Sequence, residues 1–257
     1  MEVLIISIVA FLVAILTFFS GFGLGTILTP VMMIFFPTEI AIALTGIVHF
    51  FNNVFKLFLV GNYANKGVLL RFGIPAVIAA LIGAYVLVSI PDSKPLFEYE
   101  LFSRHFMVYP VKFVISILLI LFAAIDLIPK LNRLQFDKDK LPIGGFLSGF
   151  FGGLSGNQGA LRTAFLIKAG LSKEVFIGTA VVISTFVDFT RLGVYATRIE
   201  TSGIQQNLVL IICATTAAIA GAYLGNLLLK KVTLRFLQIT VAIMLIAISL
   251  ALGLGFI

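Results

Sequence analysis

The sequence predicts an all-α, polytopic membrane protein with two inverted-topology repeats, glycine-broken half-helices and about 8–10 membrane segments. Three observations lead to this class. Of the 257 residues, 60% are hydrophobic and 11% are charged, whereas a soluble domain carries about 25% charged residues. Long apolar runs recur along the chain, for example at 3–19, 113–125 and 208–229. Two glycine-rich breaks, GFGLG and GGLSGNQG, occupy corresponding places in the two halves.

The apolar runs predict helices, because about 20 mostly apolar residues are needed to cross a bilayer. The expected helices lie at about 2–19, 26–36, 38–60, 68–90, 106–128, 141–152, 158–170, 173–196, 206–229 and 234–256. The segments 26–36 and 158–170 are too short for an ordinary crossing, and each follows a glycine-rich break. Both alternatives stay open for them: a full crossing or a re-entrant hairpin.

The two breaks belong to an internal repeat. Matching residues recur at one constant offset, namely Gly25 with Gly159, Thr29 with Thr163, Thr45 with Thr179 and Phe55 with Phe189. The chain is therefore expected to be a single transmembrane transport domain over 1–257. Repeat 1 covers about 1–129, a basic cytoplasmic linker about 130–140, and repeat 2 about 141–257.

Loop charges predict the orientation, because Lys and Arg concentrate in cytoplasmic loops. The linker and the loops at 61–72 and 230–235 carry basic residues and are expected inside. The loops at 90–105 and 197–205 then fall outside. The halves are therefore inverted, and both termini of this multi-pass plasma-membrane protein are expected outside.

Several other classes are disfavoured. The net charge of +7 is carried mostly by short loops, so no nucleic-acid partner is predicted. One cysteine, Cys213, and two histidines at unrelated positions support neither a disulfide framework nor an ordinary metal site. The sequence shows no nucleophile–base–acid set and no Walker-type phosphate loop. We therefore predict no enzyme activity, no metal and no cofactor. The N-terminal run lacks a basic leader and is expected to be retained.

The break GGLSGNQGALR at 152–162 is the strongest candidate site. A helix that starts inside the membrane leaves its first N–H groups unpaired at the positive end of its dipole, and an anion satisfies them. The substrate-binding residues expected here are Ser155, Gly156, Asn157, Gln158, Gly159 and Arg162. Gly23 and Gly25 are their counterparts in the first half. Close helix packing and snorkelling of Arg162 are the structural alternatives.

A polar stripe runs along the expected helix at 38–60. His49, Asn52, Asn53 and Lys56 recur at i, i+3, i+4 and i+7, so they share one face, and Thr45 extends it by a turn. Asn52, Asn53 and Lys56 are expected to complete the substrate pocket. A hydrogen-bonded core histidine and a lysine near the cytoplasmic end are the structural alternatives.

The stretch STFVDFTRL at 184–192 places Ser184, Asp188 and Arg191 on one helix face. Intramembrane carboxylates often mark proton or cation pathways. A structural ion pair between Asp188 and Arg191 is the alternative, and it is slightly favoured over a proton relay. The candidates for coupling or gating are His49, Asp188, Arg191, Thr45 and Thr179.

The segments GFGLGTILTPVMMIFFP (21–37) and GFFGGLSGNQGALRTAFLIKAGLSK (149–173) resemble the sulfite exporter TauE/SafE family, also called toluene-sulfonate uptake permeases. The resemblance covers nearly the whole chain. It implies transport of sulfur-containing anions such as sulfite, sulfonates or sulfolactate-like acids.

Residues and resemblance together predict a secondary transporter, in the exporting direction, that works by alternating access and is coupled to H⁺ or Na⁺. A passive small-anion channel and a membrane-embedded enzyme are the alternatives. The expected partners are the anion, the coupling ion and the lipid bilayer, and a monomer and a homodimer are both open.

Overall fold

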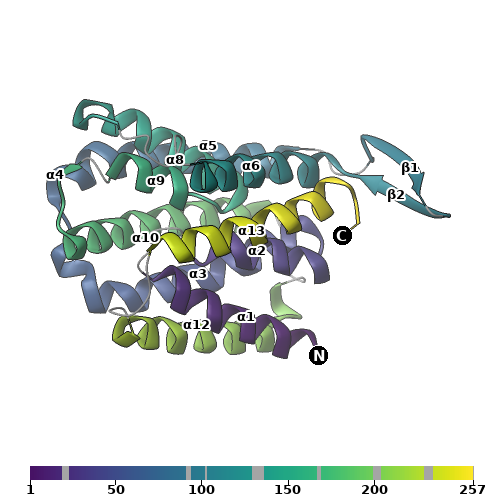
Figure 1. The fold of residues 1–257 in the computed structure, drawn as a ribbon, viewed down its shortest axis with the longest axis horizontal. Coiled ribbons are helices and arrows are strands. Elements are labelled where there is room, and N and C mark those ends of the chain that lie inside the picture. Colours follow the sequence, from purple (N-terminus) through teal and green to yellow (C-terminus); the bar gives the residue numbers. More distant parts are fainter. Residues whose placement is uncertain are drawn as a thin grey trace.

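The apolar segments form helices that lie along the long axis of the molecule in a computed structural model (Figure 1). The structure describes residues 1–18, 23–90, 94–101, 103–128, 136–166, 169–198, 204–228 and 234–256. The first half contains α1 (Glu2–Thr17), α2 (Gly25–Phe35), α3 (Thr38–Val60), α4 (Lys66–Val68), α5 (Ile74–Ser89) and α6 (Pro110–Leu127). The second half contains α8 (Leu141–Ser155), α9 (Gly159–Leu166), α10 (Lys173–Arg198), α12 (Leu208–Leu228) and α13 (Leu234–Gly253). Short helical turns are η1 (Gly61–Tyr63), η2 (Leu69–Gly73), which is π-helical, and η3 (Lys138–Lys140).

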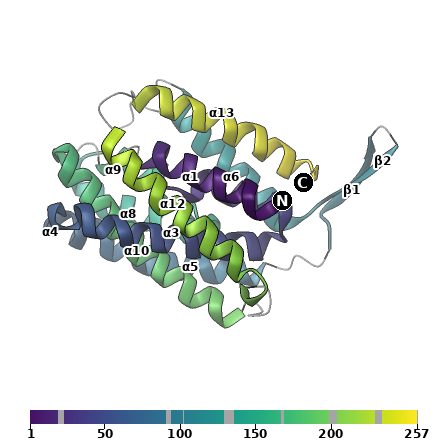
Figure 2. The same cartoon turned by 90° about the horizontal axis from the view of Figure 1, so that it is seen from below.

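A β-hairpin corrects the expected start of one helix. The helix expected at 106–128 begins only at Pro110, because the residues before it form β2 (Arg104–Val108), which pairs antiparallel with β1 (Phe97–Leu101). Proline fits the first turn of a helix, where its missing N–H is not needed. The hairpin projects beyond the helices (Figures 1 and 2), and Phe106 packs on Phe256 with ring centroids 4.9 Å apart.

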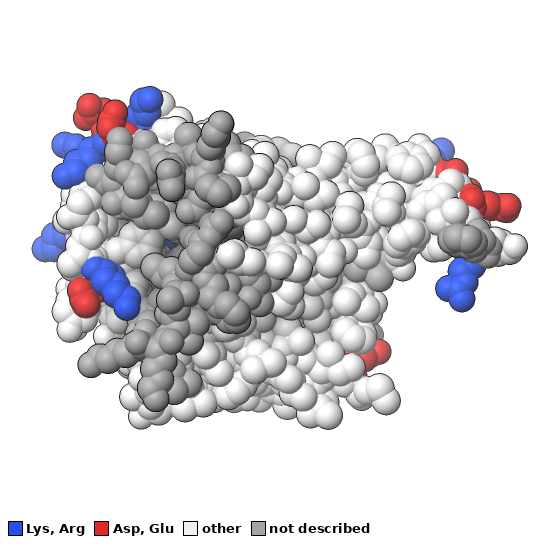
Figure 3. Space-filling model, viewed as in Figure 1, with Lys and Arg blue, Asp and Glu red and all other residues white. Residues whose placement is uncertain are grey.

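The outer surface of the helices suits a lipid environment. Four helical stretches in the described part of the chain are long and apolar enough to cross a membrane: Thr38–Tyr63, Lys66–Ser89, Lys173–Thr197 and Leu208–Leu227. Large apolar side chains such as Phe58, Phe189 and Val209 are exposed on them. Figure 3 shows the charged side chains gathered at the two ends of the molecule, with an uncharged band between them. The chain is therefore a multi-pass membrane protein.

Glycines bring pairs of helices into backbone contact. On α8, a Cβ added at Gly145, Gly149 or Gly153 would lie 1.9–2.2 Å from a carbonyl oxygen of η2 or α5. On α12, a Cβ added at Gly221 would lie 2.2 Å from the carbonyl oxygen of Phe11 in α1. Small residues allow such close approach between helices in membranes. In both pairs, α5 with α8 and α1 with α12, the two helices run in the same direction.

Two other helix pairs run antiparallel. His49 of α3 contacts Asp188 of α10, and Gly178 near the start of α10 contacts the carbonyl oxygen of Val60 at the end of α3. The end of α13 likewise meets the start of α6, where a Cβ on Gly253 would lie 2.5 Å from the hydroxyl of Ser116. Both chain termini lie at the end of the molecule that carries the β-hairpin (Figure 1).

The segment from α8 to α9 enters and leaves the molecule at one end. α8 ends at Ser155, Gly156 adopts a left-handed conformation with φ 76°, and α9 begins at Gly159. α9 returns along α8, because Gly170, which follows it, lies beside the ammonium of Lys138, which precedes α8. α8 and α9 therefore run antiparallel in the described structure, and a re-entrant hairpin at 158–170 stays a prediction.

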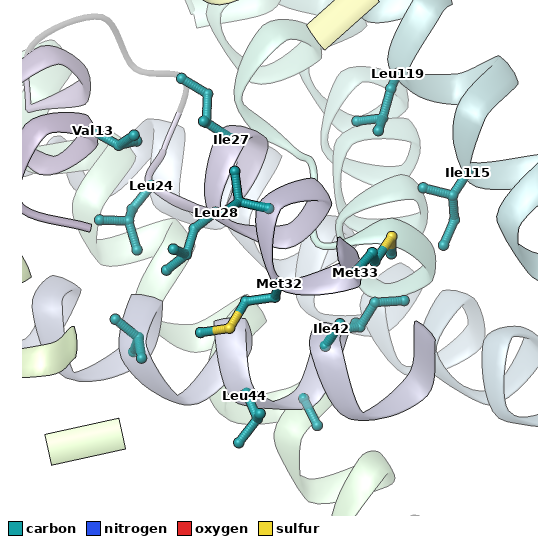
Figure 4. Packing of buried hydrophobic residues seen from close by; sticks show 14 of the residues in the cluster. Val13, Leu24, Ile27, Leu28, Met32, Met33, Ile42, Leu44, Ile115 and Leu119 are labelled. Atoms are coloured by element: carbon teal, nitrogen blue, oxygen red, sulfur yellow. The ribbon is translucent and has the colours of Figure 1, made fainter. Parts of the chain in front are cut away.

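The short helix α2 is buried over most of its length, and Ile34 near its end is exposed. Its residues from Gly25 to Met33 are buried, and Leu24, Leu28 and Met32 pack with side chains from α1, α3 and α6 (Figure 4). Gly23, with φ 80°, precedes it. A chain turn with this backbone conformation favours glycine. The start of α2 therefore lies near the end of α8 inside the bundle. The buried polar side chains surround this point.

Candidate functional site

The interior of this apolar molecule contains a concentrated set of polar side chains. They come from α3, from the turn between α8 and α9, from α9 itself and from α10. Each is at most 4% exposed: His49, Asn52, Asn53, Lys56, Asn157, Gln158, Arg162, Ser184, Asp188 and Arg191. Buried charges and amides are costly in a membrane protein and usually serve binding or transport.

The polar stripe on α3 faces α10 rather than lipid. His49, Asn53 and Lys56 are buried, whereas Phe51 and Phe58 on the other side of the helix are 49% and 82% exposed. The helical spacing of the stripe accounts for this division, because residues at i, i+4 and i+7 share one face. The polar face of α3 therefore points into the protein, and its role in binding substrate stays a prediction.

Asp188 is the centre of a buried network. Its Oδ2 lies 2.5 Å from Nδ1 of His49 and accepts a hydrogen bond of 2.9 Å from the amide of Asn53. Its Oδ1 accepts a hydrogen bond of 3.0 Å from Nε of Arg191 and lies 3.0 Å from Nη2 of the same side chain. One carboxylate thus holds α3 against α10. The ion pair with Arg191 expected from the i+3 spacing is present, and a coupling role for it stays a prediction.

A small cavity lies beside this network. Its polar lining comes from Asn53 and Lys56 on α3, Arg162 on α9 and Ser184 on α10. The remaining lining residues are Thr17, Phe18, Gly23, Phe176, Ile177, Ala180 and Val181. Its volume is about 20 Å³, which is room for about one water molecule.

Two cations reach this cavity. Lys56 is 3% exposed and Arg162 is 2% exposed. Nη1 of Arg162 donates a hydrogen bond to the hydroxyl of Ser184, and Nζ of Lys56 lies 5.1 Å from the ring centroid of Phe18. The described lining contains no carboxylate, and the nearest described one is that of Asp188 in the adjoining network.

The residues of the second break divide between several places. Arg162 reaches the cavity, whereas the hydroxyl of Ser155 donates to the carbonyl oxygen of Phe151. Gly156 lies against the guanidinium of Arg191. The amide of Asn157 makes no side-chain hydrogen bond to the described residues, and the backbone carbonyl of Gln158 accepts from Ser148. Gly159 is the first residue of α9.

The remaining expected residues also separate. Gly23 lines the cavity, and a Cβ on it would lie 2.8 Å from Nε2 of His49. Gly25 abuts the carbonyl oxygen of Gly156. Asn52 and Thr45 are buried but do not line the cavity. The hydroxyl of Thr179 accepts the backbone N–H of Asn65 where α10 meets the turn before α4, away from this group.

Sequence reasoning did not assign four residues that belong to this region. Thr17 and Phe18 line the cavity from the end of α1, and no local pattern relates α1 to α9. Thr29 lies beside Gly156. Its match with Thr163 at the constant offset was a sequence signal that could have identified it. Tyr195 donates to the carbonyl oxygen of Gly153 at 2.5 Å; it stands four residues after Arg191 and continues the polar face of α10.

Fold and site together define a class: a polytopic helical membrane protein with two buried cations at a small interior cavity. The family model described as Sulfite exporter TauE/SafE matches residues 6–252, and the chain belongs to this family. It is a family of membrane transporters of sulfur-containing anions rather than of enzymes. Comparison with curated proteins and with solved structures found no match.

Proposed function

We propose that the protein is a secondary transporter that exports a sulfur-containing anion, with the cavity between α3, α9 and α10 as its binding site. The observation that carries this proposal is the pair Lys56 and Arg162, both buried and both lining one cavity without a carboxylate in its described lining. Sulfite, sulfonates and related organosulfur acids are the substrate class.

The chemistry of the cavity matches an oxyanion. A buried cation is unfavourable unless a negative charge compensates it. An anion between Lys56 and Arg162 supplies that charge, and each hydrogen bond to a charged group contributes about 1.5–3 kcal/mol. The hydroxyl of Ser184 also lines the cavity and is a further donor. The guanidinium fork of arginine suits two oxygens of one sulfur atom.

The size of the cavity supports alternating access. Room for about one water molecule is too little for a sulfonate. The anion therefore requires a wider form of the site that opens toward one side of the membrane at a time.

Helix pairing supports an inverted repeat within one transport domain. If the halves are related by a two-fold axis in the membrane plane, α1 corresponds to α8 and α5 to α12. The pair of α1 with α12 then corresponds to the pair of α8 with α5, and both pairs are parallel and close. α3 with α10 and α6 with α13 are antiparallel, as helices beside such an axis must be. Broken helices that meet at the middle of such a repeat commonly form the transport site.

The charge distribution supports one orientation of the chain in the membrane, which is compatible with export. Lys66, Lys138 and Lys173 lie at the end of the molecule opposite the hairpin, and the positive-inside rule assigns that end to the cytoplasm. Lys56 and Arg162 lie on this side of Asp188, so the cavity is closer to the cytoplasm. This orientation puts both termini and the hairpin outside the cell, in the plasma membrane.

His49 and Asp188 are the proposed coupling residues. They form a buried titratable pair that joins α3 to α10, and His49 also contacts Gly23, which lines the cavity. A proton on this pair would alter the charge next to the bound anion. Na⁺ is the alternative coupling ion, and imposed gradients distinguish the two.

The test is flux of sulfite and a panel of sulfonates in proteoliposomes. A coupled transporter accumulates its anion under a pH or Na⁺ gradient, whereas a channel only equilibrates it. Arg162→Gln and Lys56→Gln should each lower flux roughly tenfold or more, since each removes a charged hydrogen bond. Lys66→Gln, at an exposed position outside the cavity, is the control. Wild-type flux in a correctly inserted Arg162→Gln variant would exclude this site.

A further inference from the structure

A second group of buried polar side chains lies where the start of α2 meets the end of α8. A Cβ built on Gly25 would lie 3.0 Å from the carbonyl oxygen of Gly156, 3.8 Å from Cγ2 of Thr45 and 3.9 Å from Oγ1 of Thr29. A Cβ built on Gly156 would lie 2.8 Å from Nη1 of Arg191 and 3.5 Å from Oγ1 of Thr29. Thr29 of α2 and Arg191 of α10 therefore turn polar atoms toward this contact, and Thr45 of α3 packs against it through its methyl group. We call this place the tip site.

The two threonine hydroxyls of the tip site have no hydrogen-bond partner among the described residues. Oγ1 of Thr29, Oγ1 of Thr45 and Nη1 of Arg191 make no hydrogen bond of ordinary geometry to the described residues, and all three side chains are at most 2% exposed. The hydroxyl of Tyr195 donates to the carbonyl oxygen of Gly153 and also interacts with the guanidinium of Arg191. Buried polar groups in proteins are almost always hydrogen-bonded. Several unpaired buried polar atoms at one place therefore indicate that a ligand binds there in another state of the protein.

The charge at the tip site selects the kind of ligand. Arg191 is a cation and only donates hydrogen bonds, and threonine hydroxyls also donate. α2 has 11 residues and begins at Gly25, so the positive end of its dipole points to the same place. The nearby carboxylate of Asp188 is already shared by His49, Asn53 and Arg191. An anion is favoured, and a metal cation is opposed by Arg191.

The tip site lies farther along α3 than the cavity, on the other side of the His49–Asp188 pair. Lys56 and Thr45 lie on one face of α3, eleven residues apart, which is about 16 Å along a helix. His49 and Asp188 lie between them and separate the cavity from Arg191. We propose that the tip site is a second binding station for the transported sulfur oxyanion, reached after it passes the His49–Asp188 pair. The inference rests on the proposed function.

In this structure the tip site is shut. The start of α2 is in contact with Gly156, and Arg191 remains on Asp188. The station forms when these two backbone segments separate and the anion reaches Thr29, Thr45 and the guanidinium. An anion at this position replaces the closed backbone contact and satisfies the orphan donors.

The double variant Thr29→Val with Thr45→Val tests the proposal. Valine keeps the shape of threonine and removes the hydroxyl. The matched control is Thr185→Val, because the hydroxyl of Thr185 is also buried but donates to the carbonyl oxygen of Val181 in its own helix. Each variant is measured for thermal unfolding in detergent, for stabilisation by sodium sulfite, and for sulfite flux in proteoliposomes.

The second station predicts a specific combination of results. The double variant should unfold at the same or a higher temperature, because two unsatisfied hydroxyls are gone. It should keep its stabilisation by sulfite, which reports the first cavity, and lose flux by roughly tenfold. Thr29→Ser with Thr45→Ser, which keeps both hydroxyls, should transport near the wild-type rate.

Other outcomes would overturn it. Flux equal to that of Thr185→Val would mean that the tip site holds water or nothing. Loss of sulfite stabilisation together with flux would mean one continuous site rather than two. If the wild-type protein neither binds nor moves any anion of the panel, the proposed function itself fails, and this result is separate from both others.

Discussion

Nδ1 of His49 on α3 lies 2.5 Å from Oδ2 of Asp188 on α10, although the two residues are 139 positions apart in the chain. They join the two halves of the protein between two groups of buried polar side chains. On one side are Lys56 and Arg162 at the cavity, and on the other Arg191 at the tip site.

Asp188→Asn should destabilise the protein. The substitution leaves the buried guanidinium of Arg191 without its carboxylate, and breaking a buried ion pair costs about 3–5 kcal/mol. The free energy of unfolding, measured with denaturant in detergent, checks this. Asp139→Asn, at an exposed position, should leave it unchanged. Equal stability of both variants would mean that the network does not hold α3 to α10.

Gly149→Ala should disrupt the contact between α5 and α8. The new Cβ would lie 1.9 Å from the carbonyl oxygen of Ala76, so the helices must move apart. Overpacking of this kind costs about 1–3 kcal/mol. Gly193→Ala is the control, because its Cβ would meet nothing within 4 Å and alanine favours the helix. Detergent melting curves should therefore shift down for the first variant and stay level or rise for the second.

Gly156→Ala should impair transport more than Gly170→Ala. Both glycines are left-handed, with φ 76° and 68°, so both variants incur about 1–2 kcal/mol of backbone strain. The Cβ added at position 156 would also lie 2.8 Å from Nη1 of Arg191. The Cβ added at position 170 would lie 3.7 Å from its nearest neighbour, the Nζ of the flexible Lys138 side chain. Anion flux normalised to folded protein separates the two effects. A similar loss of flux in both variants would mean that backbone strain alone explains the effect of Gly156→Ala.

Labelling of single cysteines should report the orientation. In a Cys213→Ser background, Arg104→Cys lies on the exposed hairpin and Lys140→Cys lies on exposed η3. A membrane-impermeant maleimide should label the first variant in intact cells and the second only after permeabilisation. The opposite pattern would invert the topology and would make the cavity face outward, which argues for uptake instead of export.

Most of the helices could be predicted from the sequence because their cause is local. An apolar run long enough to cross a bilayer must satisfy its backbone hydrogen bonds internally, so it becomes a helix. The spacing of His49, Asn53 and Lys56 likewise places them on one face of α3, wherever that helix packs. The hairpin at 97–108 was missed because its short strands are specified by pairing and by contacts of Phe106 with Phe256.

The composition of the site could be predicted only in part. Arg162, Lys56 and Asn53 were expected and line one cavity, but Asn52 and the residues from Ser155 to Gln158 do not. Local polarity indicates that a residue is unusual in a membrane. It does not indicate which of two nearby polar groups the residue joins, because that depends on how α2, α8 and α9 turn back inside the bundle.

The sequence by itself determined that this chain lies in a membrane, where its helices run and which faces of them are polar, since each follows from residues close together in the chain. The tertiary structure decided that Arg162 meets Lys56, that Asp188 is shared between His49 and Arg191, and that Gly25 touches Gly156. These contacts depend on the packing of glycine-lined helices from both halves, and no stretch of local sequence contains that information.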